Sequence, residues 1–248
     1  MPKAKPAVPE LAVVVPVRNE QDNVLPLIAE IHAALEGVAE FEVVYVDDGS
    51  DDRTPERLAE ARTRFPRLVT LRHRESCGQS AAVATGVKAA RARFVATLDG
   101  DGQNDPADIP AMLDRLRAAA DPDRFLVAGW RAKRRDSAVK RITSKLANAL
   151  RRALLHDDTP DTGCGLKVFT REGFLNLPRF DHMHRYLPAL FLRAGGSVVS
   201  VAVNHRPRER GTSKYGTLDR ALVGISDLLG VMWLMRRGSV PEIAPPDA

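Results

Sequence analysis

Two carboxylates separated by one residue stand out first in this sequence. Asp99 and Asp101 directly follow the apolar segment Phe94–Leu98. Two acidic residues at positions i and i+2 after a strand can reach the same ion, and carboxylate oxygens suit Mg²⁺ or Mn²⁺. Gln103 adds an amide oxygen two residues further on. Taken alone, such a pair could equally be an acidic surface turn, but its position after a buried run favours a metal site.

A second acidic group follows another apolar run. Asp47 and Asp48 come directly after Phe41–Val46. Their carboxylates could accept hydrogen bonds from a nucleobase or a ribose, and Pro16–Glu20 offers similar polar groups earlier in the chain. The alternative is that this turn caps a helix beginning at Thr54. Neither a GxGxxG nor a GxxxxGK[ST] motif is present, which argues against a dinucleotide-binding fold or a P-loop.

The elements that must position these residues alternate between strands and helices. Continuous β-branched runs are typical of strands buried on both faces, as in parallel sheets. Alternation of such runs with helical patterns predicts a doubly wound sheet, with the acidic groups at its carboxyl edge. The expected strands are Leu11–Val17, Phe41–Val46, Arg67–Leu71 and Phe94–Leu98, and the expected helices are Val24–Leu35, Thr54–Phe65 and Gly78–Ala92.

The second half of the chain is less regular and more basic. Strands are expected at Phe125–Gly129, Leu166–Thr170 and Ser197–Val203, and helices at Ser137–Leu155, His184–Arg193 and Ala221–Leu234. A basic loop, Arg206–Lys214, lies between the last strand and the last helix. We expect residues 1–10 and 238–248 to be disordered.

The composition narrows the range of possible binding partners. The 248 residues carry a formal charge of +5, which favours anionic partners such as nucleotides, lipid phosphates or membrane surfaces. Nucleic acid is a poor candidate, because only 5% of residues are aromatic and the standard binding motifs are missing. The two cysteines are far apart and Leu11 is preceded by no apolar stretch, so we expect free thiols, no signal peptide and a cytoplasmic location.

The motifs PVRNE, DDGSDDRT and DGDGQNDP, in this order, resemble glycosyltransferase family 2. Further segments resemble its dolichol-phosphate mannosyltransferase branch and bacterial relatives that attach a sugar to undecaprenyl phosphate. These segments are Gly129–Arg131, VKRITS, Asp161–Phe169 and RERGTSKYG. The resemblance spans Leu11 to Leu234. It implies an α/β fold of the GT-A type: a Rossmann-like, mostly parallel sheet flanked by helices, with a catalytic domain at 11–214 and an amphipathic helical segment near the membrane at 215–237.

The resemblance also implies roles for individual residues. Those expected to bind the donor nucleotide are Pro16, Arg18, Glu20, Asp47, Asp48 and Asp99. The expected ligands of Mg²⁺ or Mn²⁺ are Asp99, Asp101 and Gln103. The expected catalytic residues are Asp101, Arg131, Arg208 and Lys214. Those expected to bind an acceptor phosphate are Lys140, Arg141, Ser144, Arg208, Ser213 and Lys214, with Lys140 standing where the family pattern has arginine.

The implied reaction is an inverting transfer of a sugar from a UDP- or GDP-linked donor to a polyprenyl phosphate. A phosphate monoester has a second pKa near ~6 and is already largely ionised at neutral pH. Such an acceptor needs cations rather than a base, and the basic second half supplies them. One alternative is transfer to a saccharide hydroxyl of a cell-envelope glycan or glycolipid, with Asp161 as the base. Asp161 could also orient a cation, bind sugar or form a turn. Another alternative is an inactive nucleotide-sugar-binding protein.

The last apolar segment bears on membrane attachment. Ala221–Leu234 is shorter than the ~20 residues that span a bilayer, and it contains Asp227. It is therefore either a core helix or a helix lying in the membrane interface, with Trp233 at headgroup depth and Arg236 and Arg237 on lipid phosphates. We expect peripheral attachment to the cytoplasmic face of the membrane.

Overall fold

The computed structural model describes residues 8–132, 151, 152, 154–207 and 217–239. Within them a seven-stranded sheet runs in the order β3-β2-β1-β4-β6-β5-β7. Every neighbouring pair is parallel except those made by β6, which is antiparallel to both β4 and β5. The strands are β1 Leu11–Val17, β2 Phe41–Asp47, β3 Leu68–Arg72, β4 Phe94–Thr97, β5 Phe125–Trp130, β6 Lys167–Thr170 and β7 Ser197–Ala202.

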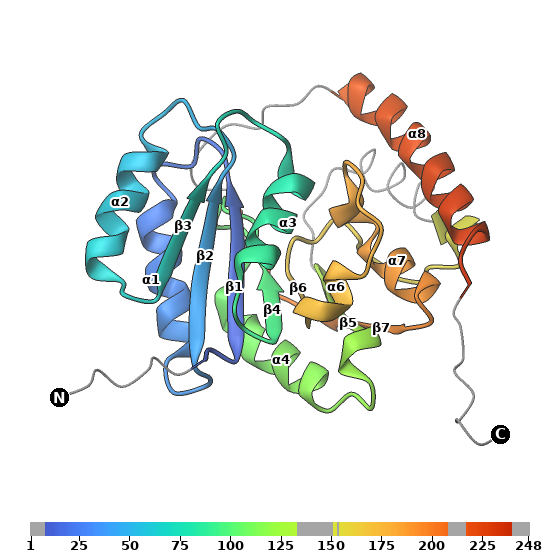
Figure 1. The fold of residues 1–248 in the computed structure, drawn as a ribbon, viewed down its shortest axis with the longest axis horizontal. Coiled ribbons are helices and arrows are strands. Elements are labelled where there is room, and N and C mark those ends of the chain that lie inside the picture. The colour runs from blue at the N-terminus through green and yellow to red at the C-terminus, as the bar shows by residue number, and fades with distance from the viewer. Residues whose placement is uncertain (1–7, 133–150, 153, 208–216, 240–248) are drawn as a thin grey trace, which may run out of the picture.

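Helices cover both faces of this sheet (Figure 1). One apolar core joins the sheet to α1 (Val24–Leu35), α2 (Thr54–Arg64) and α4 (Ile109–Arg117). A second core joins the opposite face to α3, α6, α7 and α8. Their bounds are Gln79–Ala89, Arg171–Leu175, Leu187–Arg193 and Thr217–Arg236. Short 3₁₀ turns lie at Pro106–Asp108, Pro122–Arg124 and Met183–Arg185.

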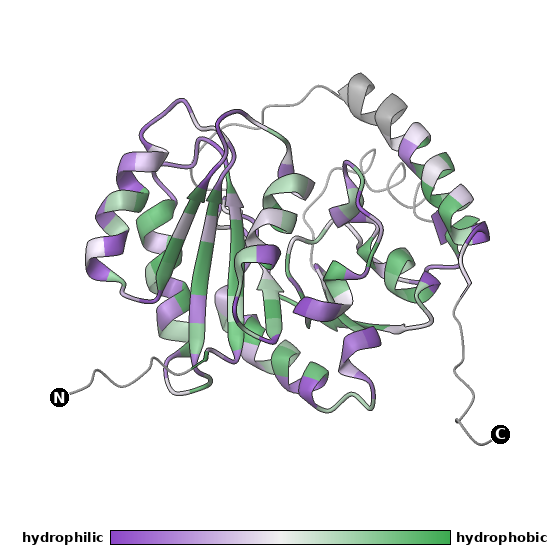
Figure 2. Ribbon diagram, viewed as in Figure 1, coloured by the Kyte–Doolittle hydropathy of each residue, from purple (hydrophilic) through white to green (hydrophobic). Residues whose placement is uncertain are grey.

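The central strand β1 shows why the middle of the sheet is predominantly apolar. Leu11 and Val13 belong to the core under α1, whereas Ala12 and Val14 belong to the core under α3. Side chains of a strand alternate between faces, so a strand covered on both faces needs no polar positions. Figure 2 shows the strands as predominantly hydrophobic and the loops beyond their upper ends as hydrophilic. The polar groups of the sequence therefore gather at one edge of the sheet.

The predicted, mostly parallel sheet is confirmed, and β6 is the strand that runs against the others. The chain returns from the carboxyl end of β5 and enters β6 in the opposite direction, so that Thr97 of β4 pairs with Lys167 at the start of β6. In an antiparallel pair the beginning of one strand lies beside the end of the other. The segment before β6 therefore lies next to the residues that follow β4, and this placement brings a lysine to the predicted metal site.

Other expectations need smaller corrections. The single helix expected at His184–Arg193 is a 3₁₀ turn followed by α7, and α4 and α6 were not predicted. Residues 8–10 of the expected disordered start are ordered, since the Glu10 amide donates to the Glu40 carbonyl at 2.7 Å and its carboxylate pairs with Arg117. Most of the helix expected at Ser137–Leu155 lies outside the described residues, as do 1–7 and 240–248 of the expected disordered ends.

One side of the last helix, α8, packs against the core, and another side is exposed. Val231 of α8 is fully buried in the second core. Ile225, Leu229 and Trp233, spaced four residues apart, are 58%, 53% and 58% exposed and form an apolar stripe on another side of the same helix. No helix among the described residues is both long enough and apolar enough to cross a bilayer. The side of α8 that carries Val231 thus packs in the core, whereas the side that carries the apolar stripe is exposed.

Candidate active site

The side chains that could bind a ligand or take part in catalysis lie where β1, β2 and β4 end. These strands are neighbours and run in the same direction, so the segments that follow them meet at one edge of the sheet (Figure 1). We call the segments 18–23, 47–53 and 73–78, which follow β1, β2 and β3, the nucleoside loops, after the role predicted for the first two. Asn19 links two of them. Its backbone lies in the left-handed region, its amide donates to Ser50 Oγ at 2.9 Å, and its side-chain oxygen accepts from the Asp51 amide.

Asp48 binds the third nucleoside loop. One of its carboxylate oxygens accepts from His73 Nδ1 at 2.7 Å and the Cys77 amide at 2.8 Å. The other accepts from Ser76 Oγ at 2.8 Å and the Gly78 amide at 2.9 Å. Burial by itself would raise the pKa of Asp48, but these hydrogen bonds to the ionised form outweigh it and hold the pKa below its usual value. The buried carboxylate thus fixes the loop before α3.

Asp47 is also bound by other groups of the protein. Asp47 accepts from the Ser50 amide at 2.9 Å and pairs with Arg72 at 3.2 Å. The helix-capping alternative is wrong for both aspartates, because Arg53 occupies the N-cap position of α2. Arg18 is exposed at the end of β1.

Two further predicted donor contacts lie nearby. Pro16 lines a cavity beside Asp99. Glu20 accepts from the Asn23 side chain at 2.7 Å, and its amide donates to Thr54 Oγ1 at 2.9 Å.

The predicted metal pair lies after β4. Burial, and then the neighbouring Asp101 carboxylate, raise the pKa of Asp99, and the positive charges of Lys167 and Arg131 offset this only in part. Gln79, at the start of α3, donates to Asp99 from its amide nitrogen at 2.8 Å. A Cβ atom at Gly165 would lie 2.2 Å from the Asp99 carboxylate, so that position has no room for a side chain. A carboxylate whose pKa is raised by burial and by a second carboxylate beside it belongs to a donor set that a divalent cation stabilises.

Gln103 and Arg206 hold the loop that carries Asp101 in place. The Gln103 amide donates to Asp101 at 3.1 Å, and its side-chain nitrogen donates to the Arg206 carbonyl at 3.2 Å. The Arg206 guanidinium in turn pairs with Glu30 at 2.7 Å and with Asp105 at 2.8 Å. The segment that leads into the basic loop is therefore fastened to the loop that carries the acidic pair.

A second group of possible metal ligands lies in the nucleoside loops. Ligand atoms of Asp48, His73 and Cys77 lie within 4.8 Å of one another. A thiol and an imidazole suit Zn²⁺ better than Mg²⁺ or Mn²⁺. In addition, His73 binds Asp48 and Thr85 through its two ring nitrogens. The oxygen-rich pair at Asp99 and Asp101 is the better fit for Mg²⁺ or Mn²⁺.

Arg131 follows β5 and is held by Asp161. Its Nε and one terminal nitrogen contact the two carboxylate oxygens at 2.6 and 2.8 Å, and both side chains are largely buried. A planar guanidinium held in this bidentate way has a fixed orientation. Among the sequence-based alternatives for Asp161, orientation of a cation is the one that this geometry favours.

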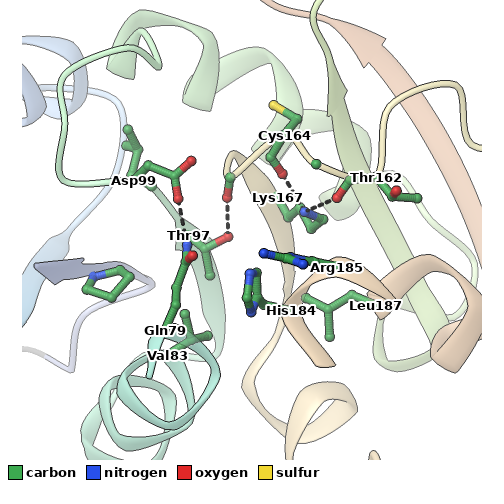
Figure 3. Close-up of a pocket in the computed structure, with 14 residues that line it drawn as sticks. Gln79, Val83, Thr97, Asp99, Thr162, Cys164, Lys167, His184, Arg185 and Leu187 are labelled. Atoms are coloured by element: carbon green, nitrogen blue, oxygen red, sulfur yellow. Dashed lines mark hydrogen bonds between the residues drawn. The ribbon is translucent and has the colours of Figure 1, made fainter. Parts of the chain in front are cut away.

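A small cavity of about 160 Å³ lies between Asp99, the start of α3, the segment before β6 and the turn before α7. Figure 3 shows Lys167, His184 and Arg185 facing it from one side, opposite Asp99 and Gln79. We call it the cation cavity. Burial lowers the pKa of the Lys167 ammonium, which donates to the carbonyls of Thr162 and Cys164. Burial, and then the Lys167 charge, lower the pKa of His184 to about 3, so its ring is neutral.

The predicted acceptor-phosphate residues cannot be placed in this way. Lys140, Arg141, Ser144, Arg208, Ser213 and Lys214 lie outside the described residues. Five residues near the site were not predicted from the sequence: His73, Gln79, Lys167, His184 and Arg185. Lys167 lies within the motif Asp161–Phe169, so that segment did carry a signal. The others follow no motif or spacing that separates them from ordinary polar residues.

Comparison with known proteins defines the class. Residues 12–177 match the model of glycosyl transferase family 2. The chain is 38% identical over 240 residues to dodecaprenyl-phosphate galacturonate synthase from Rhizobium johnstonii, covering 94% of this chain and 69% of that protein. It is 34% identical over 210 residues to undecaprenyl-phosphate 4-deoxy-4-formamido-L-arabinose transferase from Edwardsiella ictaluri, covering 84% of this chain and 63% of that protein.

A solved structure shares the fold. Glucosyl-3-phosphoglycerate synthase from Mycobacterium tuberculosis, in complex with Mn²⁺, UDP and phosphoglyceric acid, superposes with a TM-score of 0.68 at 18% identity, over 94% of this chain and 80% of that one. The fold and the site thus define a glycosyltransferase of the GT-A type, as the sequence predicted. The chain belongs to glycosyltransferase family 2. It spans 69% and 63% of the lengths of the two curated relatives.

Proposed function

We propose that this glycosyltransferase moves a sugar, with inversion, from a nucleotide sugar to the phosphate of a polyprenyl lipid at the cytoplasmic face of a membrane, with Mg²⁺ or Mn²⁺ bound. The observation that carries the proposal is the convergence of the acidic pair Asp99 and Asp101 with the oriented Arg131 at one edge of the sheet. The names of the two relatives, both polyprenyl-phosphate sugar transferases, support the acceptor.

The cation would be held by Asp99, Asp101 and the side-chain oxygen of Gln103. When bound, it supplies positive charge for the donor diphosphate. Gln103 suits this role because its side-chain nitrogen donates to the Arg206 carbonyl, which directs the amide oxygen the other way. Gln79 and the tight approach of Gly165 restrict the Asp99 carboxylate to one place. The protein thus orients its oxygen ligands before any substrate arrives.

Arg131 stabilises the negative charge of the leaving group. When the bond between the sugar and the diphosphate breaks, negative charge grows on the diphosphate oxygen, and an oriented guanidinium stabilises it. Asp161 keeps the Arg131 side chain in that orientation through its two contacts. The lipid phosphate oxygen forms the new bond to the anomeric carbon from the opposite face, and the nucleoside diphosphate leaves with the electron pair.

No proton needs to be removed from such an acceptor. A phosphate oxygen is already ionised at neutral pH, whereas a saccharide hydroxyl requires a base. Asp161 was the candidate base for the saccharide alternative, and both of its oxygens contact Arg131. This pairing favours the phosphate acceptor. The basic residues expected to hold that phosphate, among them Lys140 and Lys214, lie outside the described residues.

Attachment to the membrane is supported by α8. Its exposed stripe of Ile225, Leu229 and Trp233 offers apolar side chains, and Arg236 and Arg237 follow at its end. An apolar stripe flanked by arginines suits a helix lying in the interface of an anionic membrane. Such a helix would keep the active site near the lipid acceptor.

The direct test is transfer of labelled sugar to undecaprenyl phosphate, with Mn²⁺ or Mg²⁺ and a panel of UDP- and GDP-sugars. We expect label in the lipid phase that disappears when EDTA removes the metal. Undecaprenol, which lacks the phosphate, is the matched control and should accept no sugar. Transfer to undecaprenol or to a saccharide hydroxyl, with none to the lipid phosphate, would contradict the proposal. Donor binding without transfer to any acceptor would favour the inactive binding protein.

A further inference from the structure

The cluster of Asp48, His73 and Cys77 brings three kinds of metal ligand together. A carboxylate oxygen, an imidazole nitrogen and a thiol sulfur lie within 4.8 Å of one another. His73 and Cys77 are four positions apart in the loop after β3, whereas Asp48 directly follows β2. Zn²⁺ accepts such a mixed set of ligands in a tetrahedral site, whereas Mg²⁺ and Mn²⁺ prefer oxygen ligands.

The backbone around the cluster is fixed by contacts within the protein. The amides of Cys77 and Gly78 donate to the two carboxylate oxygens of Asp48 at 2.8 and 2.9 Å. Gly49 has no room for a side chain, because a Cβ atom there would lie 2.8 Å from the Glu75 backbone. The loops after β2 and β3 are therefore in close contact. The fold itself brings the three ligands together.

His73 is held in an orientation that suits a metal ligand. Its Nδ1 atom faces Asp48 at 2.7 Å, and its Nε2 atom lies 2.9 Å from Thr85 Oγ1 on α3. A hydroxyl can both donate and accept, so the ring can move its proton from Nδ1 to Nε2 and keep Thr85 as a partner. Nδ1 then offers its lone pair to an ion, and Nε2 makes the second hydrogen bond that ligating histidines usually make.

Cys77 supplies the ligand that can move. Its side chain is exposed, and its thiol contacts the Glu75 carbonyl at a distance of 3.5 Å. Ligands of a tetrahedral zinc ion lie roughly 3.5 Å apart, so the three atoms must approach one another by about 1 Å at most. The thiol releases its proton to solvent on binding, whereas Asp48 is already ionised, since hydrogen bonds keep its pKa low. A fourth position stays open for water.

We propose that the cluster of Asp48, His73 and Cys77 is a Zn²⁺ site, separate from the acidic pair Asp99 and Asp101, and that zinc bound there prevents the nucleotide donor from binding. The second half rests on the proposed function, because Asp48 is among the residues expected to bind the donor nucleotide. The two sites divide the metals by ligand chemistry: the oxygen-rich pair takes Mn²⁺ or Mg²⁺, and the cluster takes Zn²⁺. The enzyme is then inhibited by a metal different from the one that it uses.

Zinc affinity, measured by competition with a chromophoric chelator on the full chain, tests the first half. Cys77→Ser should weaken Zn²⁺ binding by at least roughly 100-fold, since loss of a ligand costs more than the 10- to 100-fold that follows from loss of a ligand's partner. His156→Asn removes an exposed histidine outside the cluster and is the matched control, which should bind zinc as the original does. Equal affinity in Cys77→Ser and the original protein would overturn the site.

Cobalt reports which ligands hold the ion. Co²⁺ replaces Zn²⁺ in tetrahedral sites, and a thiolate bound to it gives a charge-transfer absorption in the near ultraviolet. We expect this band in the original protein and its loss in Cys77→Ser. Asp101→Asn, which removes a ligand of the acidic pair, should keep the band. A band that persists in Cys77→Ser or disappears in Asp101→Asn would overturn the assignment.

Transfer assays with a fixed excess of Mn²⁺ test the inhibitory half. Zn²⁺ should raise the apparent KM of the donor and leave kcat unchanged. Relative to its own rate without zinc, Cys77→Ser should need roughly 100-fold more Zn²⁺ for the same inhibition. Zinc that instead displaces Mn²⁺ from the acidic pair would inhibit Cys77→Ser and the original protein alike, and this result would overturn the inhibitory half.

Nucleotide binding separates this inference from the proposed function. UDP and GDP are titrated calorimetrically into the protein with and without one equivalent of Zn²⁺. The nucleotide that binds should bind at least about tenfold more weakly to the zinc-loaded protein, and Cys77→Ser should abolish the difference. Unchanged binding would overturn the inhibitory half even in an active enzyme. If neither nucleotide binds without zinc, the inhibitory half fails together with the proposed function, and zinc affinity alone decides the site.

Discussion

The nucleoside loops and the cation cavity use their charged residues in opposite ways. In the nucleoside loops, groups of the protein itself bind the carboxylates. Asp48 binds the loop before α3, and Asp47 binds Ser50 and Arg72. In the cation cavity Lys167 is held by backbone carbonyls, and Arg185 faces the open volume. The carboxylates of the first region fix its own loops, whereas Arg185 in the second pairs with no carboxylate among the described residues. Residue type alone does not separate these two uses.

The largest expected effect is at the acidic pair. Asp101→Asn should lower the rate of sugar transfer by at least roughly 1000-fold, because the proposed metal site loses a charged ligand. The free energy of unfolding should stay within about 0.5 kcal/mol of the original, since a substitution of this kind away from the core changes stability little. Transfer assays and denaturant unfolding check both parts. Full activity in this variant would remove Asp101 from the metal site.

Asp161→Asn tests the role of Arg131. We expect transfer to fall by roughly 10- to 100-fold, because the guanidinium loses the bidentate partner that orients it. The free energy of unfolding should fall by about 3 kcal/mol, since a largely buried cation is left without its partner. The measurements are steady-state kinetics and denaturant unfolding.

Asp114→Asn is the matched control for that variant. It removes an exposed carboxylate that pairs with Arg117, and it should cost no more than about 0.5 kcal/mol. If Asp161→Asn retained full activity, Asp161 would have no part in orienting a catalytic group.

Asp48→Asn should act on stability more than on chemistry. At pH 7 we expect a loss of about 2 kcal/mol, because an amide cannot accept all the hydrogen bonds that the carboxylate accepts. The folded pKa of Asp48 lies below its ordinary value of 3.8, so its stabilising effect is present above that pH. The difference between the two proteins should therefore shrink as the pH falls below 3.8. Denaturant unfolding from pH 7 to pH 3 measures this, and a constant difference would contradict the role of the ionised carboxylate.

The smallest expected effect concerns the exposed stripe of α8. Trp233→Ser should weaken binding to vesicles that contain anionic lipid by about tenfold, because a large apolar side chain no longer enters the interface. Val38→Ser, which removes an exposed apolar side chain far along the chain from α8, is the control and should bind as the original does. Co-sedimentation measures both. Unchanged binding of Trp233→Ser would leave α8 without the proposed interface role.

The sequence predicted the fold well because its signal is periodic and local. The run at β1 is continuously apolar and the run at β2 is interrupted only by Glu42 before Asp47, as expected for strands buried on both faces. The reversal at β6 was missed, since strand direction depends on where the chain re-enters the sheet and not on the apolarity of Lys167–Thr170.

For a related reason, the sequence predicted some residues of the candidate site and not others. Asp99 and Asp101 could be proposed as metal ligands from the sequence because their spacing is itself a ligand pattern. The pairing of Arg131 with Asp161, 30 positions apart, and the meeting of Lys167 with Arg185 in one cavity depend on tertiary placement. Likewise, the sequence shows that Asp48 can accept hydrogen bonds, but it does not show that the loop at 73–78 would supply them.

The most direct test of this account is a crystal structure of the protein with Mn²⁺ and UDP, with the metal located by its anomalous signal. The account predicts one strong peak between Asp99 and Asp101, with the Asp48 carboxylate still bound to the amides of Cys77 and Gly78. A peak at the cluster of Asp48, His73 and Cys77, with Asp99 and Asp101 left without metal, would contradict it. That result would make the nucleoside loops the metal-binding region and reverse the comparison on which the account rests.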